Sequence, residues 1–161
     1  MQTIEIKELE KSTVKYDVLL ISHVIEHIAY PDIIEFIKFY ISKLRDGGKV
    51  IIITPLLSNK FYTDIDHIKP YNIDALLQLF NSPPERSQAY SKLEGFDLID
   101  IKFRRERLDY LNNRARYIKH PLNDVINITL KIAAEAAKVL SFGVIARSTG
   151  YIAILQKLPN A

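Results

Sequence analysis

The chain has 161 residues, and its 22 Lys and Arg against 19 Asp and Glu give a formal net charge of +3, too small to indicate a class of partner. Hydrophobic residues make up 48% and charged residues 25%, which excludes a disordered or collagen-like chain. The absence of Cys excludes disulfides, thiolate nucleophiles and Cys-ligated zinc or iron–sulfur centres.

The N-terminal half predicts a strand followed by a βαβ unit. Residues 3–9 alternate Ile with Glu and Lys, which predicts a short strand. Residues 18–22 (VLLIS) and 50–54 (VIIIT) are continuous apolar runs, typical of strands buried on both faces of a parallel sheet. Between them, residues 31–45 place Ile, Tyr and Leu at helical spacing and precede a Gly-Gly pair that can end a helix.

The C-terminal half alternates helices and strands. Asn72 can cap a helix over 73–80, and a strand over 95–103 has one wetter face, which places it near a sheet edge. A second helical pattern covers 123–140, and a final strand covers 151–157. Without repeats or long linkers, the chain is expected to form one α/β domain over residues 1–161.

The sequence predicts a cytoplasmic protein without a membrane span. Its first fifteen residues alternate charged and apolar types and hold no long apolar core, unlike a secretory signal. The most apolar stretch, residues 132–146, contains Glu135 and Lys138 and falls short of the ~20 residues that a bilayer span needs.

Four segments together resemble the second half of class I S-adenosylmethionine-dependent methyltransferases. They are residues 16–28 (YDVLLISHVIEHI), 44–55 (LRDGGKVIIITP), 66–71 (DHIKPY) and 95–96 (GF). The resemblance covers residues 14 to 104 well. It implies a truncated Rossmann-like α/β fold, a three-layer α/β/α sandwich around a mostly parallel sheet of about five strands, with S-adenosylmethionine as cofactor.

The first third of such an enzyme has no counterpart in the sequence. The family fold begins with a strand and a glycine-rich loop that approaches the cofactor, but none of the five glycines follows a strand near the N-terminus. Strand 18–22 would therefore lack one neighbour, and an exposed apolar edge invites association. We expect strand 3–9 to move in beside it; coverage by another chain, as a homodimer or a heteromer, is the alternative.

Candidate catalytic residues follow the two central strands, where open α/β sheets bind ligands. The resemblance assigns His23, His27, His67 and Tyr71 to the methyl-donor and acceptor side, with a histidine as general base. Alternatively, Glu26 and His27 only bond the turn before Pro31, and His67 is a surface residue in a helix-entry loop. His23 and His27 are four residues apart without an adjacent third ligand, so we expect no metal site. The cofactor-binding candidates are Glu8, Leu9, Ser22 and His23.

A basic segment follows strand 95–103. Aromatic residues between its cations could stack on nucleic-acid bases, and the patch could also bind a phosphate, an anionic sugar or an acidic protein. A solvated, basic strand end is the structural alternative. The candidate nucleic-acid or anion-binding residues are Arg104, Arg105, Arg107, Arg114 and Arg116.

The sequence leaves three functions open, because a fold does not fix an activity. The chain could transfer a methyl group from S-adenosylmethionine to an unknown acceptor. It could be a degenerate, non-catalytic domain that binds nucleic acid or protein. It could also be a subunit that a partner chain completes with the glycine-rich loop.

Overall fold

The computed structural model describes residues 6–58, 60–81, 93, 95–107 and 121–159. It divides into two compact units, residues 1–102 with 151–161, and residues 103–150; each is described separately below, and the expected single domain stays a prediction. The elements in chain order are α1 (Ile6–Lys11), β1 (Tyr16–Ser22), η1 (Ile25–His27), α2 (Asp32–Ser42), β2 (Leu44–Pro55), η2 (Phe61–Thr63), α3 (Ile73–Asn81), β3 (Phe96–Glu106), α5 (Pro121–Leu140) and β4 (Arg147–Lys157).

Strands β1 and β2 lie side by side in the same direction, which confirms the central prediction from the sequence. The register pairs Leu19 with Val50 and Ile21 with Ile52, so paired residues share a face of the sheet. Helix α2 connects the two strands, as the apolar spacing of residues 31–45 predicts.

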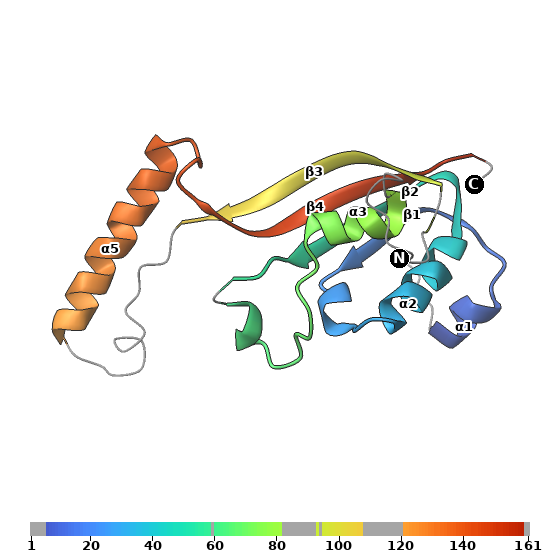
Figure 1. Cartoon of the computed structure of the whole chain (residues 1–161), viewed down its shortest axis with the longest axis horizontal. Coiled ribbons are helices and arrows are strands. Elements are labelled where there is room, and N and C mark those ends of the chain that lie inside the picture. Colours follow the sequence, from blue (N-terminus) through green and yellow to red (C-terminus); the bar gives the residue numbers. More distant parts are fainter. Residues whose placement is uncertain (1–5, 59, 82–92, 94, 108–120, 160–161) are drawn as a thin grey trace. The chain divides into compact units, whose positions relative to one another are not determined.

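The sheet has four strands in the order β1-β2-β4-β3 and is mixed (Figure 1). The amide of Leu158, just after β4, donates to Gly95 O, just before β3, at 2.7 Å, so these strands run antiparallel. The end of β4 also meets the start of β2, where Lys157 Nζ donates to Leu44 O at 3.4 Å. The prediction of a mostly parallel sheet is therefore wrong, and four strands stand in the described residues where about five were expected.

The predicted strand over 3–9 is also wrong, because residues 6–11 form helix α1. The alternation of apolar and charged residues favours a strand, but the same segment, IKELEK, is a run of good helix formers. Consequently β1 lies at the end of the strand order in the described part of the chain, and residues 6–11 do not pair with it.

The hydrophobic core covers one face of the sheet. Helices α2 and α3 pack their apolar residues on that face, and the core residues include Ile21, Ile37, Ile52, Leu76, Phe80 and Leu155. Asn72 caps α3 as predicted, accepting a bond from the amide of Ala75 at 2.8 Å. On the opposite face Val18 is 53% and Leu20 59% exposed. Leu9 of α1 lines a hollow with Val18 and Leu20 there, and the expected three-layer arrangement stays a prediction.

The second unit contains α5 and the outer ends of β3 and β4. Residues 123–140 form part of α5, as predicted, and the strand end is stabilised by Arg104 Nε, which donates to Thr149 Oγ1 at 3.1 Å. Most large apolar side chains of α5 are exposed. Among the described helices, none has both the length and the hydropathy to cross a membrane.

Candidate functional site

Polar side chains gather beyond the carboxyl ends of β1 and β2. Residue His23 follows β1 with a φ of +53°, a left-handed conformation that is uncommon outside glycine. The chain then turns directly into η1, which carries Glu26 and His27. The segment after β2 supplies His67 to the same place. We call Glu26, His27 and His67 the rim cluster.

Glu26 anchors the rim cluster from inside the protein. It is fully buried, and its Oε2 accepts a hydrogen bond from Thr54 Oγ1 at 3.1 Å. Its Oε1 lies 3.2 Å from Nδ1 of His23, a half-exposed side chain. Thr54 is the penultimate residue of β2. A residue at the end of β2 therefore binds the carboxylate of Glu26, which follows β1.

Both rim histidines are oriented by backbone carbonyls. Nδ1 of His27 lies 3.0 Å from Asp66 O, and Nδ1 of His67 lies 2.7 Å from Phe61 O. The ring centroids of His27 and His67 are 4.8 Å apart, so the two imidazoles are direct neighbours.

Main-chain bonds fix the loop that carries His67. The amides of Ile68 and Lys69 both donate to Glu26 O, at 2.9 and 3.2 Å. These bonds attach the segment after β2 to η1. The proximity of His27 and His67 therefore depends on backbone as well as side-chain contacts.

Tyr71 belongs to a buried chain of hydrogen bonds behind the rim. Its hydroxyl donates to Ile28 O at 2.8 Å, and its carbonyl accepts a bond from Tyr151 Oη at 3.1 Å. Burial raises the pKa of Tyr71 and, together with the negative charge of Glu26, raises the pKa of Tyr151 well above its usual range. Both hydroxyls therefore stay protonated at neutral pH.

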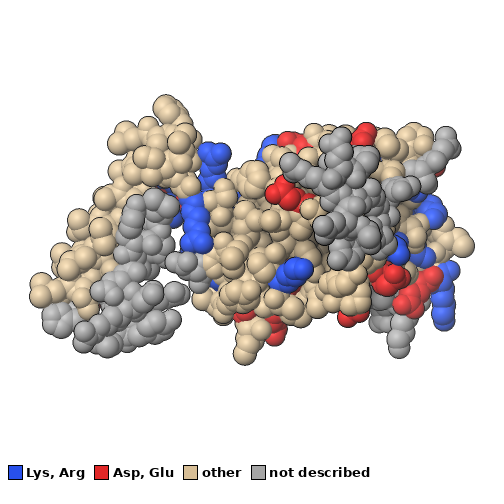
Figure 2. Space-filling view, viewed as in Figure 1, with Lys and Arg blue, Asp and Glu red and all other residues tan. Residues whose placement is uncertain are grey.

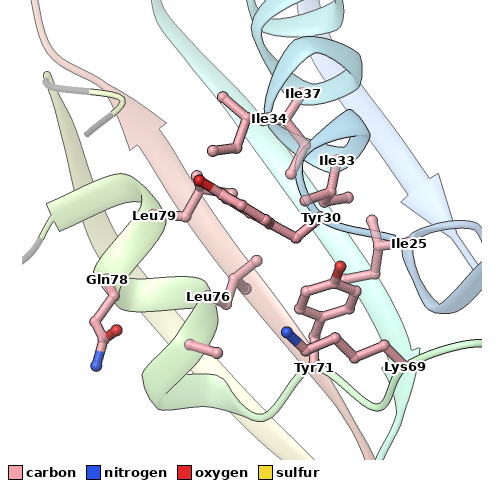
Figure 3. Close-up of a pocket in the computed structure, with 11 residues that line it drawn as sticks. Ile25, Tyr30, Ile33, Ile34, Ile37, Lys69, Tyr71, Leu76, Gln78 and Leu79 are labelled. Atoms are coloured by element: carbon pink, nitrogen blue, oxygen red, sulfur yellow. The ribbon is translucent and has the colours of Figure 1, made fainter. Parts of the chain in front are cut away.

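An apolar pocket of about 350 Å³ lies between α2 and α3 (Figure 3). Ile33, Ile34 and Ile37 line it from α2, and Leu76 and Leu79 line it from α3. Its remaining walls include Tyr30, Tyr71, Lys69 and Ile25, the last of which directly precedes Glu26. The pocket thus adjoins the rim cluster and suits a largely apolar ligand.

The structure separates the four cofactor-binding candidates. Ser22 and His23 lie at the carboxyl end of β1. Leu9 instead lines a hollow with Tyr16 and Val18, toward the start of that strand, and Glu8 lies in α1. Because the strand that was to place Glu8 and Leu9 at the rim is absent from this region, the reason for assigning them to the cofactor no longer holds.

The described arginines of the basic segment bond within the second unit. Arg104 donates to Thr149, Arg105 donates to Gly143 O at 3.1 Å, and Arg107 pairs with Glu135 at 3.4 Å. Arg114 and Arg116 lie outside the described residues. On the face in Figure 2, uncharged residues dominate the described surface, and the basic atoms form separate groups. Nucleic-acid or anion binding by these arginines stays a prediction.

Sequence reasoning placed His23, Glu26, His27 and His67 at the same sheet edge, but it did not include Glu26 among the candidate catalytic residues. It also considered His23 with His27 as a ligand pair, whereas the structure groups His27 with His67 and Glu26. One signal was available in the sequence: each member follows a strand of the same parallel pair, and such strand ends meet at one edge.

Among the comparisons with known proteins, a solved structure is similar in fold. No family model and no curated protein matches the chain. A solved structure, described as a SAM-dependent methyltransferase from Archaeoglobus fulgidus, aligns over 98% of this chain with 20% sequence identity and a TM-score of 0.51. The fold is methyltransferase-like. The chain spans 66% of the length of that structure, and the similarity between the two concerns the fold alone.

Proposed function

We propose that the chain is a methyltransferase-like protein that transfers a methyl group from S-adenosylmethionine to an acceptor at the rim of the sheet. The observation that carries this proposal is the convergence of His27 and His67 with Glu26, which His23 also contacts, beyond β1 and β2 in a fold similar to that of a SAM-dependent methyltransferase. Open α/β sheets bind ligands at this edge.

The proposal gives the rim residues distinct roles. Methyl transfer depends mainly on positioning, with a general base where the acceptor must lose a proton. His23 is half-exposed and is the proposed base. Tyr71 keeps its proton and lines the adjoining apolar pocket, which is the proposed acceptor site. The acceptor would therefore be largely apolar.

Cofactor binding is the step to test, because methyl transfer depends on it. Calorimetric titration of the purified chain with S-adenosylmethionine and its demethylated product should give saturable binding in the micromolar range. Substitution His23→Ala should weaken that binding. The matched control is Glu8→Gln, which changes an exposed residue of α1 and should leave the affinity unchanged. Absence of binding at millimolar ligand would refute methyl transfer by this chain alone.

A second candidate function is that of a subunit completed by another chain. Specific support comes from β1, which lies at the end of the described sheet and exposes Val18 and Leu20 on the face away from α2. An apolar strand edge of this kind is a template for pairing with another chain. The partner proposed for this edge is a second copy of this chain, because two β1 edges can pair antiparallel about a two-fold axis.

A further inference from the structure

The rim cluster has the donor atoms of a metal site. Glu26, His27 and His67 each offer one ligand atom, and these atoms lie within 4.8 Å of one another. Oxygen and nitrogen ligands sit about 2.0–2.2 Å from Zn²⁺, so two ligands of one ion lie at most about 4.4 Å apart. Small side-chain rotations would bring the cluster into that range.

Hydrogen bonds set the tautomers of both histidines for metal binding. A carbonyl oxygen only accepts, so the Nδ1 atoms bonded to Asp66 O and Phe61 O carry the protons. In the neutral rings Nε2 then keeps its lone pair. Metal-binding histidines characteristically donate their other ring N–H to a carbonyl or carboxylate in this way.

Glu26 brings a negative charge that a cation would compensate. The carboxylate is fully buried, and within the described residues each of its oxygens has one hydrogen-bonding neighbour, His23 Nδ1 or Thr54 Oγ1. A carboxylate has about four acceptor positions, so both oxygens keep a lone pair for another interaction. Buried charges are commonly paired or coordinate metals, and His23 supplies a positive charge only when protonated.

Asp64 lies beside the cluster as a fourth donor residue, the second that offers oxygen. Its Oδ2 is 3.6 Å from Nε2 of His67, and its side chain is exposed enough to rotate. Two imidazoles with one or two carboxylates suit zinc and other first-row divalent ions, whereas Ca²⁺ and Mg²⁺ prefer oxygen ligands throughout.

We propose that Glu26, His27 and His67 bind one divalent transition-metal ion, with Asp64 as the additional ligand. The backbone bonds from Ile68 and Lys69 to Glu26 O hold the two ligand-bearing segments together without the ion. The metal proposal does not depend on S-adenosylmethionine, because it rests on the positions and hydrogen bonds of Glu26, His27 and His67 alone.

The test uses the purified full chain after treatment with a chelator. Titration with Co²⁺ should produce visible d–d absorption that saturates at one ion per chain, and Zn²⁺ should displace it. Substitutions His27→Asn and His67→Asn keep an amide donor for the carbonyl but remove Nε2, so each should weaken binding at least tenfold. The matched carboxylate pair is Glu26→Gln, which should weaken binding, and Glu35→Gln on the exposed surface of α2, which should not.

Thermal unfolding of the unmodified chain gives a second readout that does not depend on the variants' folding. Zn²⁺ at 100 times its dissociation constant should stabilise the native state by about 2.7 kcal/mol, and a chelator should reverse the shift. Absence of saturable Co²⁺ or Zn²⁺ binding overturns the proposal. So does one-site binding that persists unchanged in folded His27→Asn and His67→Asn variants.

Discussion

Tyr151 has the largest of the fully buried side chains in the described part of the chain, and its hydroxyl supports the segment behind the rim. The hydroxyl donates to Tyr71 O, and Tyr71 in turn donates to Ile28 O, so one chain of bonds links β4 to the residue after η1. The composition alone gave no sign of this role, because the partner carbonyl lies 80 residues away in the sequence. A tyrosine inside an apolar strand pattern predicts burial but not the bond that it makes.

Tyr151→Phe should change how stability depends on pH. In the native state burial raises the pKa of Tyr151 above its usual value near 10, with the charge of Glu26 acting in the same direction. Above pH 10 the unfolded chain therefore loses this proton while the native chain keeps it, so the free energy of unfolding falls as pH rises. The contribution to this slope is at most about 1.4 kcal/mol per pH unit.

Urea unfolding at pH 8 and at pH 11 would measure this effect. At pH 8 the variant should lose about 1–2 kcal/mol, because Tyr71 O loses its buried donor. Between the two pH values its stability should fall less steeply than that of the unmodified chain. Tyr62→Phe, at a side chain that is 63% exposed, is the control and should preserve the steep fall. Equal slopes in the Tyr151 variant and the unmodified chain would contradict the assignment.

Among the elements, β1, α2 and β2 were predictable because their signals are long and consistent. Two continuous β-branched runs with a helical pattern between them favour parallel strands, and the register of β1 and β2 agrees. The strand prediction for residues 6–11 is wrong because a short alternating pattern fits both a strand and a helix. The surface against which the segment packs decides between them, and the sequence does not show that surface. Burial against tertiary neighbours determines the secondary structure of such segments, and the local sequence does not identify those neighbours.

The start of β2 also differs from the prediction, because its two glycines permit an irregular strand start. The sequence run predicts strand residues from Val50, whereas β2 begins at Leu44. The register shifts between Tyr16 and Val18, which pair with Leu44 and Lys49, so the β2 side carries extra residues. Gly47 takes a φ of +75° in this bulge. The glycine pair was interpreted as a helix end, but it permits an irregular strand start.

Gly48→Ala should destabilise the protein by about 1–3 kcal/mol, as overpacking does. A Cβ at this position would lie 2.8 Å from Arg45 O and 3.1 Å from Asp17 O, and backbone atoms of the β1–β2 pair cannot yield easily. Chemical denaturation of the variant and the unmodified chain would measure the loss. Gly47→Asn is the control: a Cβ there meets nothing within 4 Å, and asparagine tolerates positive φ, so the change should be small. A loss confined to the Gly47 variant would contradict this account of the bulge.

Across the whole molecule, the sequence predicts the parallel pairing of β1 with β2 and the polar residues beyond their carboxyl ends. It does not predict the mixed sheet or the exposed face of β1. Continuous apolar runs were interpreted as strands buried on both faces, yet β1 buries Ile21 and exposes Val18 and Leu20. The same sequence is compatible with solvent on that face or with another chain against it. Exposed apolar patches of this kind commonly mark interaction surfaces.

The homodimer expected from the sequence stays a prediction, and the edge of β1 is where a second copy would pair. Two copies related by a two-fold axis would place their β1 strands antiparallel, pairing the outer edges and bringing the Val18 and Leu20 side chains of both copies onto one continuous apolar face. Light scattering at increasing concentration should therefore report a mass approaching twice 18.6 kDa. Leu20→Lys should shift the protein to monomer, since a charge on the joined face would be desolvated or repelled by its copy.

Leu20 is 59% exposed, so the lysine variant should keep the fold and the unfolding temperature of the dissociated chain. Leu57→Lys is matched in residue type and exposure, at 58%, but lies after β2 and should leave the dimer intact. A chain that is monomeric at every concentration, or a dimer that Leu20→Lys does not weaken, would exclude self-pairing at β1. Because the proposed metal ligands lie in η1 and in the segment after β2, and none lies on β1, dissociation should leave metal binding unchanged.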